Sequence, residues 1–322
     1  MSVPGTMRAM ALRRFGGIDV LEPQILPVPS PGPRDVLIAV AFAGVGEWDV
    51  FEREGGYARL LGTQAVFPYV LGSEGAGVVA AVGERVDRFR VGDPVYAIGF
   101  LNPSGGFYAE YAAVHEDLVS PIPGALPLDQ AAVFGGVGIT ALRGLEDILG
   151  IMPGESVLIF GASGGVGHVA VQFAKRMGAR VLAVASGRDG VQLVQRLGAD
   201  AAVDGRSDDV LAAARAFAPD GLDAALLTAG GETAQQALSA LREGARIAFP
   251  YGVRPEPTPV RDGRIQGYYA DPDRDIIERL NRLVSRGPFE VHVAEVFSLD
   301  QAARAHEALG RHYLGKLALR VT

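Results

Sequence analysis

Cysteine is absent from this chain of 322 residues, and aromatic side chains make up only 7% of it. Without cysteine there is no disulfide bond, no thiol nucleophile, no iron–sulfur cluster and no zinc site with thiolate ligands. The five histidines show none of the paired spacing typical of metal ligands, so we expect no metal site. The chain also lacks an apolar run of about 18 residues and a block of basic residues, which argues against a membrane span and against nucleic acid as a partner.

Apolar residues and glycine, by contrast, are plentiful. The chain is 48% hydrophobic with 43 glycines, and its 322 residues exceed the size at which one hydrophobic core keeps growing. The net charge of −7 is modest and spread along the sequence. The segment from Met1 to Met10 has no apolar core or cleavage site typical of an export signal, so we expect a cytoplasmic location. Together these features predict a two-domain αβ enzyme.

The most informative segment runs from residue 157 to residue 167, where an apolar strand-like stretch ends in a glycine-rich turn. Ala162, Gly164 and Gly167 have the spacing of a dinucleotide-binding turn, with alanine at the first glycine position. Small residues there let the chain turn tightly and approach a pyrophosphate, so that the phosphates meet free N–H groups at a helix N-terminus. A helical stretch from Val166 to Met177 and a strand from Arg180 to Ala185 complete the unit that this motif requires. The alternative is a glycine turn that binds nothing.

Three regions differ in their hydrophobic pattern. Residues 1–124 contain short strand-like runs broken by glycine and proline, which predicts a mostly antiparallel β domain. In residues 125–269 apolar strands alternate with helical stretches, which predicts a doubly wound parallel sheet and an α/β fold class. The ending, residues 270–322, indicates a return to the first domain. The main predicted elements are strands Asp35–Phe42, Gly77–Val82, Pro94–Ile98, Tyr108–Val114, Val157–Phe160, Ala201–Val203, Ala224–Leu227, Ile247–Phe249, Val291–Phe297 and Lys316–Val321, and helices Asp273–Arg286 and Leu299–Leu309.

Several spaced motifs resemble the medium-chain dehydrogenases/reductases, and in particular their quinone oxidoreductase branch. The motifs are Gly72–Gly77, Val91–Val95, Gly106–Val114, Gly138–Ala141, Gly161–Gly167, Leu197–Asp200 and Gly315–Lys316. The resemblance covers nearly the whole chain and implies a GroES-like catalytic domain split around a Rossmann domain. It also implies an NADPH cofactor bound by Thr140, Ala162, Ser163, Gly164, Gly165, Val166, Ser186, Arg188, Phe249 and Tyr251.

Two departures from this family narrow the expected chemistry. Zinc alcohol dehydrogenases of the family hold their metal with a cysteine and a histidine in the segments that match Gly44–Asp49 and Gly72–Glu74. This chain has Gly46 and Ser73 at those two places. Without a Lewis acid, ionising an alcohol loses several kcal/mol of charge stabilisation. Hydride addition to a quinone or an α,β-unsaturated carbonyl suits such a site better, because the charge spreads onto an oxygen that hydrogen-bond donors can hold.

The catalytic residues are predicted from the same segment. The quinone oxidoreductase branch usually has asparagine, aspartate and tyrosine at the positions of Gly46, Asp49 and Phe51, and this chain keeps only the aspartate. We expect Asp49 to order its loop, and Tyr57 to donate a hydrogen bond or proton to the developing oxyanion; a rim tyrosine without that role is the alternative. The predicted pocket for a flat substrate consists of Gly46, Trp48, Phe51 and Phe67, for which core packing is the alternative.

The end of the second Rossmann strand predicts NADPH rather than NADH. An NAD-specific turn places an acid about twenty residues after the glycine motif, on the ribose 2′-hydroxyl. Here the strand runs into Ser186, Gly187 and Arg188, which can donate to a 2′-phosphate. Asp189 is the contrary sign if the strand continues further, and a solvated loop arginine is the alternative for Arg188.

Two further expectations concern the whole protein. The strand-like residues Arg264–Tyr269 would leave an open sheet edge, so we expect a homodimer that pairs such edges, unless a loop of the same chain covers the edge. The leading functional hypothesis is the reductase described above, acting on a small-molecule quinone or enone. The alternative is a non-catalytic NADPH-binding protein with a structural or regulatory role.

Overall fold

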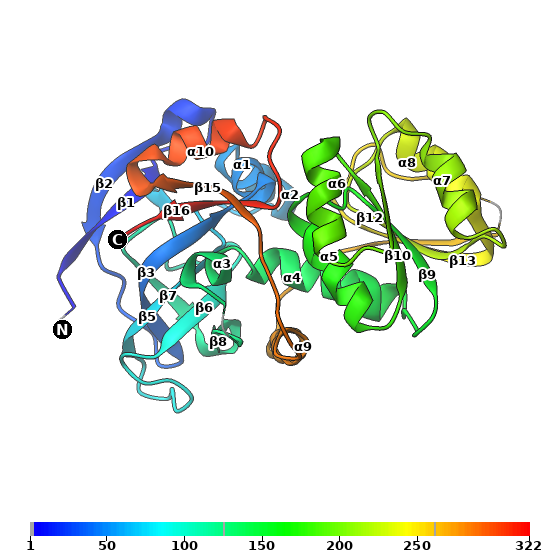
Figure 1. Ribbon diagram of the computed structural model, residues 1–322. Coiled ribbons are helices and arrows are strands. Elements are labelled where there is room, and N and C mark those ends of the chain that lie inside the picture. Colours follow the sequence, from blue (N-terminus) through cyan, green and yellow to red (C-terminus); the bar gives the residue numbers. More distant parts are fainter. Residues whose placement is uncertain (1–2, 125, 261) are drawn as a thin grey trace. The chain divides into compact units, whose positions relative to one another are not determined.

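The computed structural model describes residues 3–124, 126–260 and 262–322, which form two compact units (Figure 1). The first unit consists of the chain up to Gly136, together with Pro272–Gly287 and Val291–Thr322. The second unit consists of Val137–Asp271 and Pro288–Glu290. The sequence predicts the first boundary between residues 124 and 125; Ala125 lies outside the described residues, as do Met1 and Ser2. No described helix is long and apolar enough to cross a membrane.

The first unit is built on a seven-stranded sheet in the order β15-β16-β3-β5-β6-β8, with β7 paired to β3. A second sheet of three strands has the order β2-β1-β4. The strands are β1 (Thr6–Leu12), β2 (Leu21–Pro27), β3 (Asp35–Val45), β4 (Tyr69–Val70), β5 (Glu74–Val82), β6 (Pro94–Ile98), β7 (Tyr111–His115), β8 (Val119–Pro121), β15 (Val293–Ser298) and β16 (Lys316–Arg320). The helices of this unit are α1 (Glu47–Arg53), α2 (Gly56–Leu61), α3 (Leu128–Ala132), α9 (Arg274–Val284) and α10 (Ala302–Ala308).

Glycine in β5 brings the central strands of this sheet unusually close together. A Cβ on Gly77 would lie 2.0 Å from the carbonyl oxygen of Ala39 in β3, so only glycine fits there. The antiparallel pairing of β3 with β5 and β7 places the start of α1 directly after the end of β3. This arrangement positions the segment from which we predicted the catalytic residues.

The second unit is a parallel sheet of six strands in the order β11-β10-β9-β12-β13-β14. The strand order reverses at β9, the strand that precedes the glycine turn, and ligands of such sheets bind at that switch point. The strands are β9 (Ser156–Phe160), β10 (Arg180–Ala185), β11 (Ala201–Asp204), β12 (Leu222–Leu227), β13 (Leu241–Pro250) and β14 (Arg264–Tyr268). The helices are α4 (Gly135–Leu142), which begins in the first unit, a π-helical segment (Arg143–Ile148), α5 (Gly165–Arg176), α6 (Gly187–Arg196), α7 (Val210–Phe217) and α8 (Glu232–Ala237).

The predicted fold class is confirmed, with shifts at element ends and some omissions. The strand expected over Tyr108–Val114 is β7, which begins only at Tyr111, and the last predicted helix begins as a 3₁₀ turn before α10. The omitted elements include β1, β2, β4, β8, α1, α2 and α3. These three omitted helices are each shorter than eight residues, which is too short for a helical period to stand out in the sequence.

A buried ion pair joins the last strand of the chain to the centre of the first unit. The ammonium of Lys316, on β16, lies 3.0 Å from Oε1 of Glu74, on β5, and the two side chains are only 4% and 1% exposed. Oε2 of Glu74 accepts a hydrogen bond of 2.8 Å from the backbone N–H of Gly136. The Lys316 ammonium also lies 4.2 Å from the centre of the Trp48 ring. One charged pair therefore holds β5, β16, the start of α4 and the tryptophan of α1 together.

We predict that Lys316→Met lowers the free energy of unfolding by about 3–5 kcal/mol, because it leaves the Glu74 carboxylate buried without its counter-charge. Equilibrium urea unfolding measures this change. Adding Glu74→Gln to Lys316→Met removes the stranded charge, so the double variant should recover much of the loss. A single variant as stable as the wild type would contradict the role given to this pair.

Candidate active site

The loop between β3 and α1 is closed by Asp49. Its Oδ2 accepts a hydrogen bond of 2.8 Å from the backbone N–H of Gly46, the residue that precedes the helix. The Asp49 side chain is fully buried, and burial together with the nearby charge of Glu52 raises its pKa well above the usual range. A carboxyl that is sealed from solvent and bonded to the loop backbone in this way fixes the loop and is not exposed to a ligand.

Trp48 is held in place on three sides. A Cβ on Gly46 would lie 2.6 Å from the Trp48 ring, so the indole packs directly on the glycine backbone. Phe100 meets the indole edge-on with ring centres 6.0 Å apart, and the Lys316 ammonium lies over the ring face. The indole nitrogen is buried without a hydrogen-bond partner among the described residues. Trp48 is therefore a fixed, half-buried surface with one unused donor.

The other predicted pocket residues form separate ring pairs. Phe51 meets Tyr57 edge-on with ring centres 4.9 Å apart, and Phe67 meets Phe15 at 5.2 Å. Phe51 and Phe67 are 44% and 37% exposed, which leaves apolar surface open to a ligand. Burial and the charges of Glu52 and Asp49 raise the pKa of Tyr57 to about 12, so its phenol stays protonated and can donate a hydrogen bond.

A buried polar chain that the sequence did not reveal runs inward from Asp49. The Tyr108 hydroxyl donates to Oδ2 of Asp49 at 3.4 Å and lies 3.1 Å from Nε2 of His306, on α10. Nδ1 of His306 lies 3.1 Å from the Arg53 guanidinium, which donates to that nitrogen. Burial and the charge of Arg53 lower the pKa of His306 to about 3, so the imidazole is neutral. This chain ties α1 to α10 through neutral groups and one arginine.

Glu52 is a second buried acid on α1, and the sequence analysis did not single it out. Its side chain is 5% exposed, and Oε1 accepts a hydrogen bond from the hydroxyl of Tyr69, on β4. Burial raises the Glu52 pKa to about 7, although the hydrogen bond from Tyr69 acts in the opposite direction. The sequence marks Glu52 only weakly, as an acid on the buried side of a short helix.

The residues at the two expected zinc positions do not fit a metal ion. Gly46 offers no side chain, and the hydroxyl of Ser73, which is 2% exposed, has no hydrogen-bond partner among the described residues. The neighbouring carboxylate of Glu74 already holds the Lys316 ammonium. No group of three histidine or acid side chains in the described ranges could hold a metal ion.

In the second unit the predicted dinucleotide turn is present and tightly packed. A Cβ on Gly167 would lie 2.2 Å from the carbonyl oxygen of Gly161, so α5 can approach β9 only with glycine there. Gly164 precedes α5 and Gly165 begins it. Ala162 donates its backbone N–H to Val184 at 2.9 Å, which ties the turn to β10. The first N–H groups of α5 therefore stand at the switch point of the sheet, where an anion can bind them.

The end of β10 has the predicted register. The strand ends at Ala185, Ser186 precedes α6, and the Ser186 N–H donates to the Ser163 hydroxyl at 3.1 Å. Arg188 is exposed in the first turn of α6. Asp189, the contrary sign, accepts a hydrogen bond of 2.9 Å from the N–H of Gly190 and so faces its own helix.

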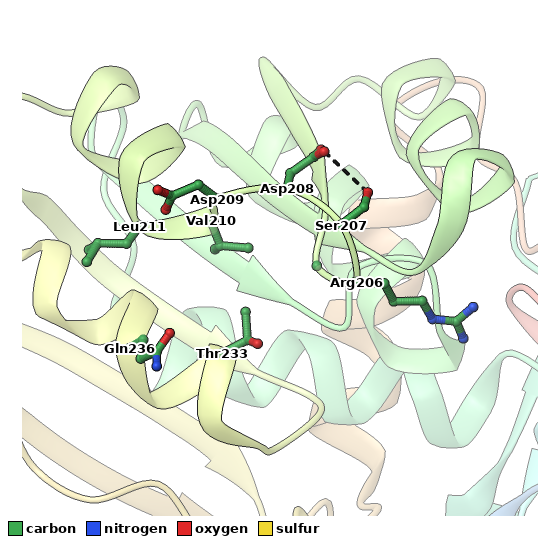
Figure 2. A pocket seen from close by; sticks show the side chains of 9 residues that line it. Arg206, Ser207, Asp208, Asp209, Val210, Leu211, Thr233 and Gln236 are labelled. Atoms are coloured by element: carbon green, nitrogen blue, oxygen red, sulfur yellow. Dashed lines mark hydrogen bonds between the residues drawn. The ribbon is translucent and has the colours of Figure 1, made fainter.

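A second arginine that the sequence analysis missed stands beside this strand end. Gly205, which follows β11, donates to the carbonyl of Ala185 at 2.8 Å. Oδ1 of Asp204 accepts from the N–H groups of Gly187 and Arg206 at 2.9 and 3.0 Å, so the loops carrying Arg188 and Arg206 are tied together. The loop after β11 also borders a cavity of about 390 Å³ against α8, and Figure 2 shows the exposed Arg206 side chain extending away from Thr233.

The remaining predicted cofactor residues lie on α4, on β13 and directly after β13. Thr140, on α4, accepts a hydrogen bond of 2.8 Å on its carbonyl from the Tyr268 hydroxyl. Phe249 is buried near the carboxyl end of β13, and its ring lies 6.1 Å from that of Tyr251. Tyr251 follows β13 and is 49% exposed. Phe249 and Tyr251 therefore lie at the same edge of the sheet as the glycine turn.

Comparison with known proteins agrees with this architecture. Residues 32–124 match the alcohol dehydrogenase GroES-like domain, and residues 165–265 match the zinc-binding dehydrogenase domain. The quinone oxidoreductase of Mus musculus is 31% identical over 97% of this chain and 97% of its own length. A solved NAD-dependent alcohol dehydrogenase is 31% identical with a TM-score of 0.88, covering 98% of this chain and 100% of its own. A mycobacterial protein solved with NADPH is 26% identical with a TM-score of 0.81 over the same shares.

A GroES-like β unit together with a parallel sheet that carries a dinucleotide turn defines a nicotinamide-dependent oxidoreductase. The chain belongs to the medium-chain dehydrogenase/reductase family, and it matches the quinone oxidoreductases of that family over nearly its whole length. The predicted family and the prediction of an enzyme are confirmed. The zinc named in the description of one matching domain has no fitting ligands at Gly46 and Ser73.

Gly167 and Gly164 provide a matched pair of substitutions in the dinucleotide turn. Gly167→Ala should lower the stability by about 1–3 kcal/mol, because its methyl group meets the Gly161 carbonyl at 2.2 Å. In Gly164→Ala the methyl group lies 3.4 Å from the same oxygen, so the melting temperature should hold while nicotinamide cofactor binding weakens. Thermal unfolding and fluorescence titration with NADPH measure the two effects. Equal melting temperatures for both variants would contradict the close approach of α5 to β9.

Proposed function

We propose that this protein is an NADPH-dependent reductase that adds hydride to a quinone or an α,β-unsaturated carbonyl without zinc. The proposal rests on the residues at the position where zinc relatives hold their metal. Ser73 offers only a hydroxyl there, and the neighbouring Glu74 is bound to Lys316. No residue there can ionise an alcohol as a metal ion would. Conjugated acceptors avoid that requirement, because their reduction places charge on an oxygen that neutral donors can stabilise.

The glycine turn and the ends of β10 and β13 would hold the cofactor. The N–H groups at the start of α5 fit a pyrophosphate, and Gly164 leaves the backbone open to it. Ser186, Arg188 and Arg206 fit the adenosine end, and Tyr251 provides an exposed ring at the same sheet edge. When bound, the reduced nicotinamide supplies the hydride.

The segment from Gly46 to Phe67 would hold the acceptor. Trp48 offers a fixed flat surface, and Phe51 and Phe67 offer exposed apolar rings. Tyr57 contacts Phe51 and keeps its proton, so it can donate to the acceptor oxygen. Flat apolar walls with one or two polar donors are typical of sites for small aromatic or conjugated ligands.

The acceptor class is tested by NADPH oxidation with a panel of quinones, enones and enals, and with a saturated primary alcohol in the reverse direction with NADP⁺. We expect turnover of the conjugated acceptors and none of the alcohol. Tyr57→Phe should lower kcat by about tenfold if its hydroxyl holds the developing charge, and an unchanged rate would leave Tyr57 a packing residue. Oxidation of the alcohol with no reduction of quinones or enones would overturn the proposed function.

The preference for NADPH follows from the two arginines at the adenosine end. The β10 terminus carries no free acid, because Asp189 is bound within its own helix and Asp204 is bound to two backbone N–H groups. Hydrogen bonds from the backbone of Arg206 and Gly187 lower the pKa of Asp204, which keeps it ionised and bound to those groups. Arg188 and Arg206 then supply the positive charge that a 2′-phosphate requires.

We predict that Arg188→Ala and Arg206→Ala each lower kcat/KM for NADPH by about one to two decades and leave the value for NADH nearly unchanged, since a charge-assisted contact contributes roughly 1.5–3 kcal/mol. Steady-state kinetics with both cofactors measure the ratio. Arg215→Ala, which removes an exposed arginine from the next helix, α7, is the control and should change neither value. Equal use of NADPH and NADH by the wild type would contradict the preference.

We also propose a homodimer in which two β14 strands pair. Strand β14 is the last strand of the parallel sheet, and among described residues it pairs only with β13. Tyr251 and Tyr269, with ring centres 4.5 Å apart, expose apolar surface after the ends of β13 and β14. Sedimentation velocity at micromolar concentration should give twice the mass of one chain, and a monomer there would reject the pairing.

A further inference from the structure

Glu52 and Tyr69 form an acid–phenol pair whose geometry fits the transfer of a proton. The Tyr69 hydroxyl, on β4, is hydrogen-bonded to Oε1 of Glu52, on α1. Glu52 is 5% exposed, whereas Tyr69 is half-buried, so the phenol is the member of the pair that a ligand can reach more easily. A carboxyl behind a phenol in this way can pass a proton outward without itself meeting solvent.

Glu52 lies on the same helix as Trp48, one wall of the proposed acceptor site. Glu52 lies four residues after Trp48 on α1, so the two side chains share one face of the helix. The negative charge of Glu52 contributes to the raised pKa of Tyr57, so Glu52 and Tyr57 lie within electrostatic reach of each other. The groups whose pKa the charge of Glu52 raises are Asp49 on the same helix, Tyr57 on α2, Tyr69 on β4 and Tyr108 before β7, and Tyr69 is also hydrogen-bonded to Glu52.

We propose that Glu52 is a positioning residue that supplies the proton of the reduction through the hydroxyl of Tyr69. This inference rests on the proposed function, because only a hydride acceptor of that class requires the proton. Hydride adds with its electron pair to the electron-poor carbon, and the π electrons move onto the acceptor oxygen. Tyr69 donates to Oε1 of Glu52 in the structure, so the step requires the protonated carboxyl to turn this hydrogen bond round and donate to the phenol oxygen. The O–H bond of Tyr69 then breaks as its proton joins the acceptor oxygen, and the Glu52 carboxyl proton joins the phenol oxygen. Glu52 ends as a carboxylate, and water returns the proton to it through the hydroxyl of Tyr69, because Glu52 itself is only 5% exposed.

The carboxyl behind the phenol makes this step easier than transfer from tyrosine alone. Tyr69 acting alone would become a phenolate next to Glu52 and Asp49, and the charges of both acids together with burial raise its pKa far above the usual range. With Glu52 as the source, the charge ends on a group whose pKa is about 7. A phenol-type oxyanion has a pKa of about 10, so the transfer runs downhill.

The pH dependence of the reaction has a defined sign. Glu52 must be protonated to give its proton, and burial places its pKa at about 7. Turnover under saturation should therefore be high below pH 7 and fall as the pH rises through about 7. Asp49, the neighbouring acid, also has a raised pKa and carries no positive charge that would lower the pKa of Glu52.

The test is kcat as a function of pH from 5.5 to 9, with saturating NADPH and with menadione or cyclohexenone, for the wild type, Glu52→Gln and Tyr69→Phe. The range of about 5.5 to 9 brackets a general acid with a pKa near 7. Glutamine keeps the shape and can still donate to Tyr69, but it holds no transferable proton. We expect both variants to be slower than the wild type by roughly a hundredfold at the acid end, with a flat profile that meets the wild type at the alkaline end.

Glu116→Gln is the matched control. Glu116 is as buried as Glu52, at 3% exposed. It follows β7, and the end of β7 pairs with the start of β3 at Asp35. Helix α1 follows the opposite end of β3, so Glu116 and Glu52 lie at different ends of that strand. This control should keep the wild-type pH profile even if its melting temperature falls. Infrared difference spectroscopy follows the carboxyl band as the pH is changed. The wild type should lose a protonated-carboxyl band near pH 7 and Glu52→Gln should not, which locates the proton independently of turnover.

The outcomes separate this inference from the proposed function. A wild type that reduces both acceptors with a profile unchanged in Glu52→Gln overturns the role of Glu52 and leaves the proposed function standing. A uniform loss of rate at every pH, with no change of profile, overturns it as well, because that result marks a structural role. A wild type that oxidises NADPH with neither acceptor overturns the proposed function, and the proton step falls with it.

Discussion

The buried pair of Lys316 and Glu74 links several separate segments of the first unit. Two charges taken out of water are tolerable only when they meet, so the chain must bring its last strand back beside β5. The same lysine covers the face of Trp48, and the same glutamate holds the N–H of Gly136. The position of the tryptophan, and with it the proposed acceptor surface, therefore depends on where the C-terminal strand lies. A cation bound to Glu74 also takes the place that a metal would require.

Helix α1 concentrates most of the proposed chemistry in seven residues. One of its faces carries Trp48 and Glu52, while Asp49 and Arg53 lead into the buried polar chain that ends on α10. Burial raises the pKa of both acids on this short helix, and the charge of Glu52 raises that of Asp49 further. In our proposal the burial of Glu52 has a function, because a protonated carboxyl inside the protein can donate one proton. Stability and proton supply then depend on the same burial.

In the second unit, the carboxyl ends of the parallel strands bring together the segments of the proposed cofactor site. The order of strands could be anticipated, because apolar runs separated by helical stretches are a local signal. The short helices α1 and α2 could not, since neither is long enough to show a helical period. The loop after β11 illustrates a second limit: Asp204 and Arg206 gain their importance from hydrogen bonds to the end of β10, and nothing in their own neighbourhood marks them.

The sequence by itself determined the dinucleotide turn, the doubly wound sheet and the lack of zinc ligands, because each depends on residue types at fixed short spacing. Only the tertiary structure decided that Glu52 meets Tyr69, 17 residues away, and that Tyr108 meets His306, 198 residues away. The physical reason is that burial and partners set the protonation and reach of a side chain. Both are properties of the packed chain, so an acid on α1 shows its role only once β4 is folded against it.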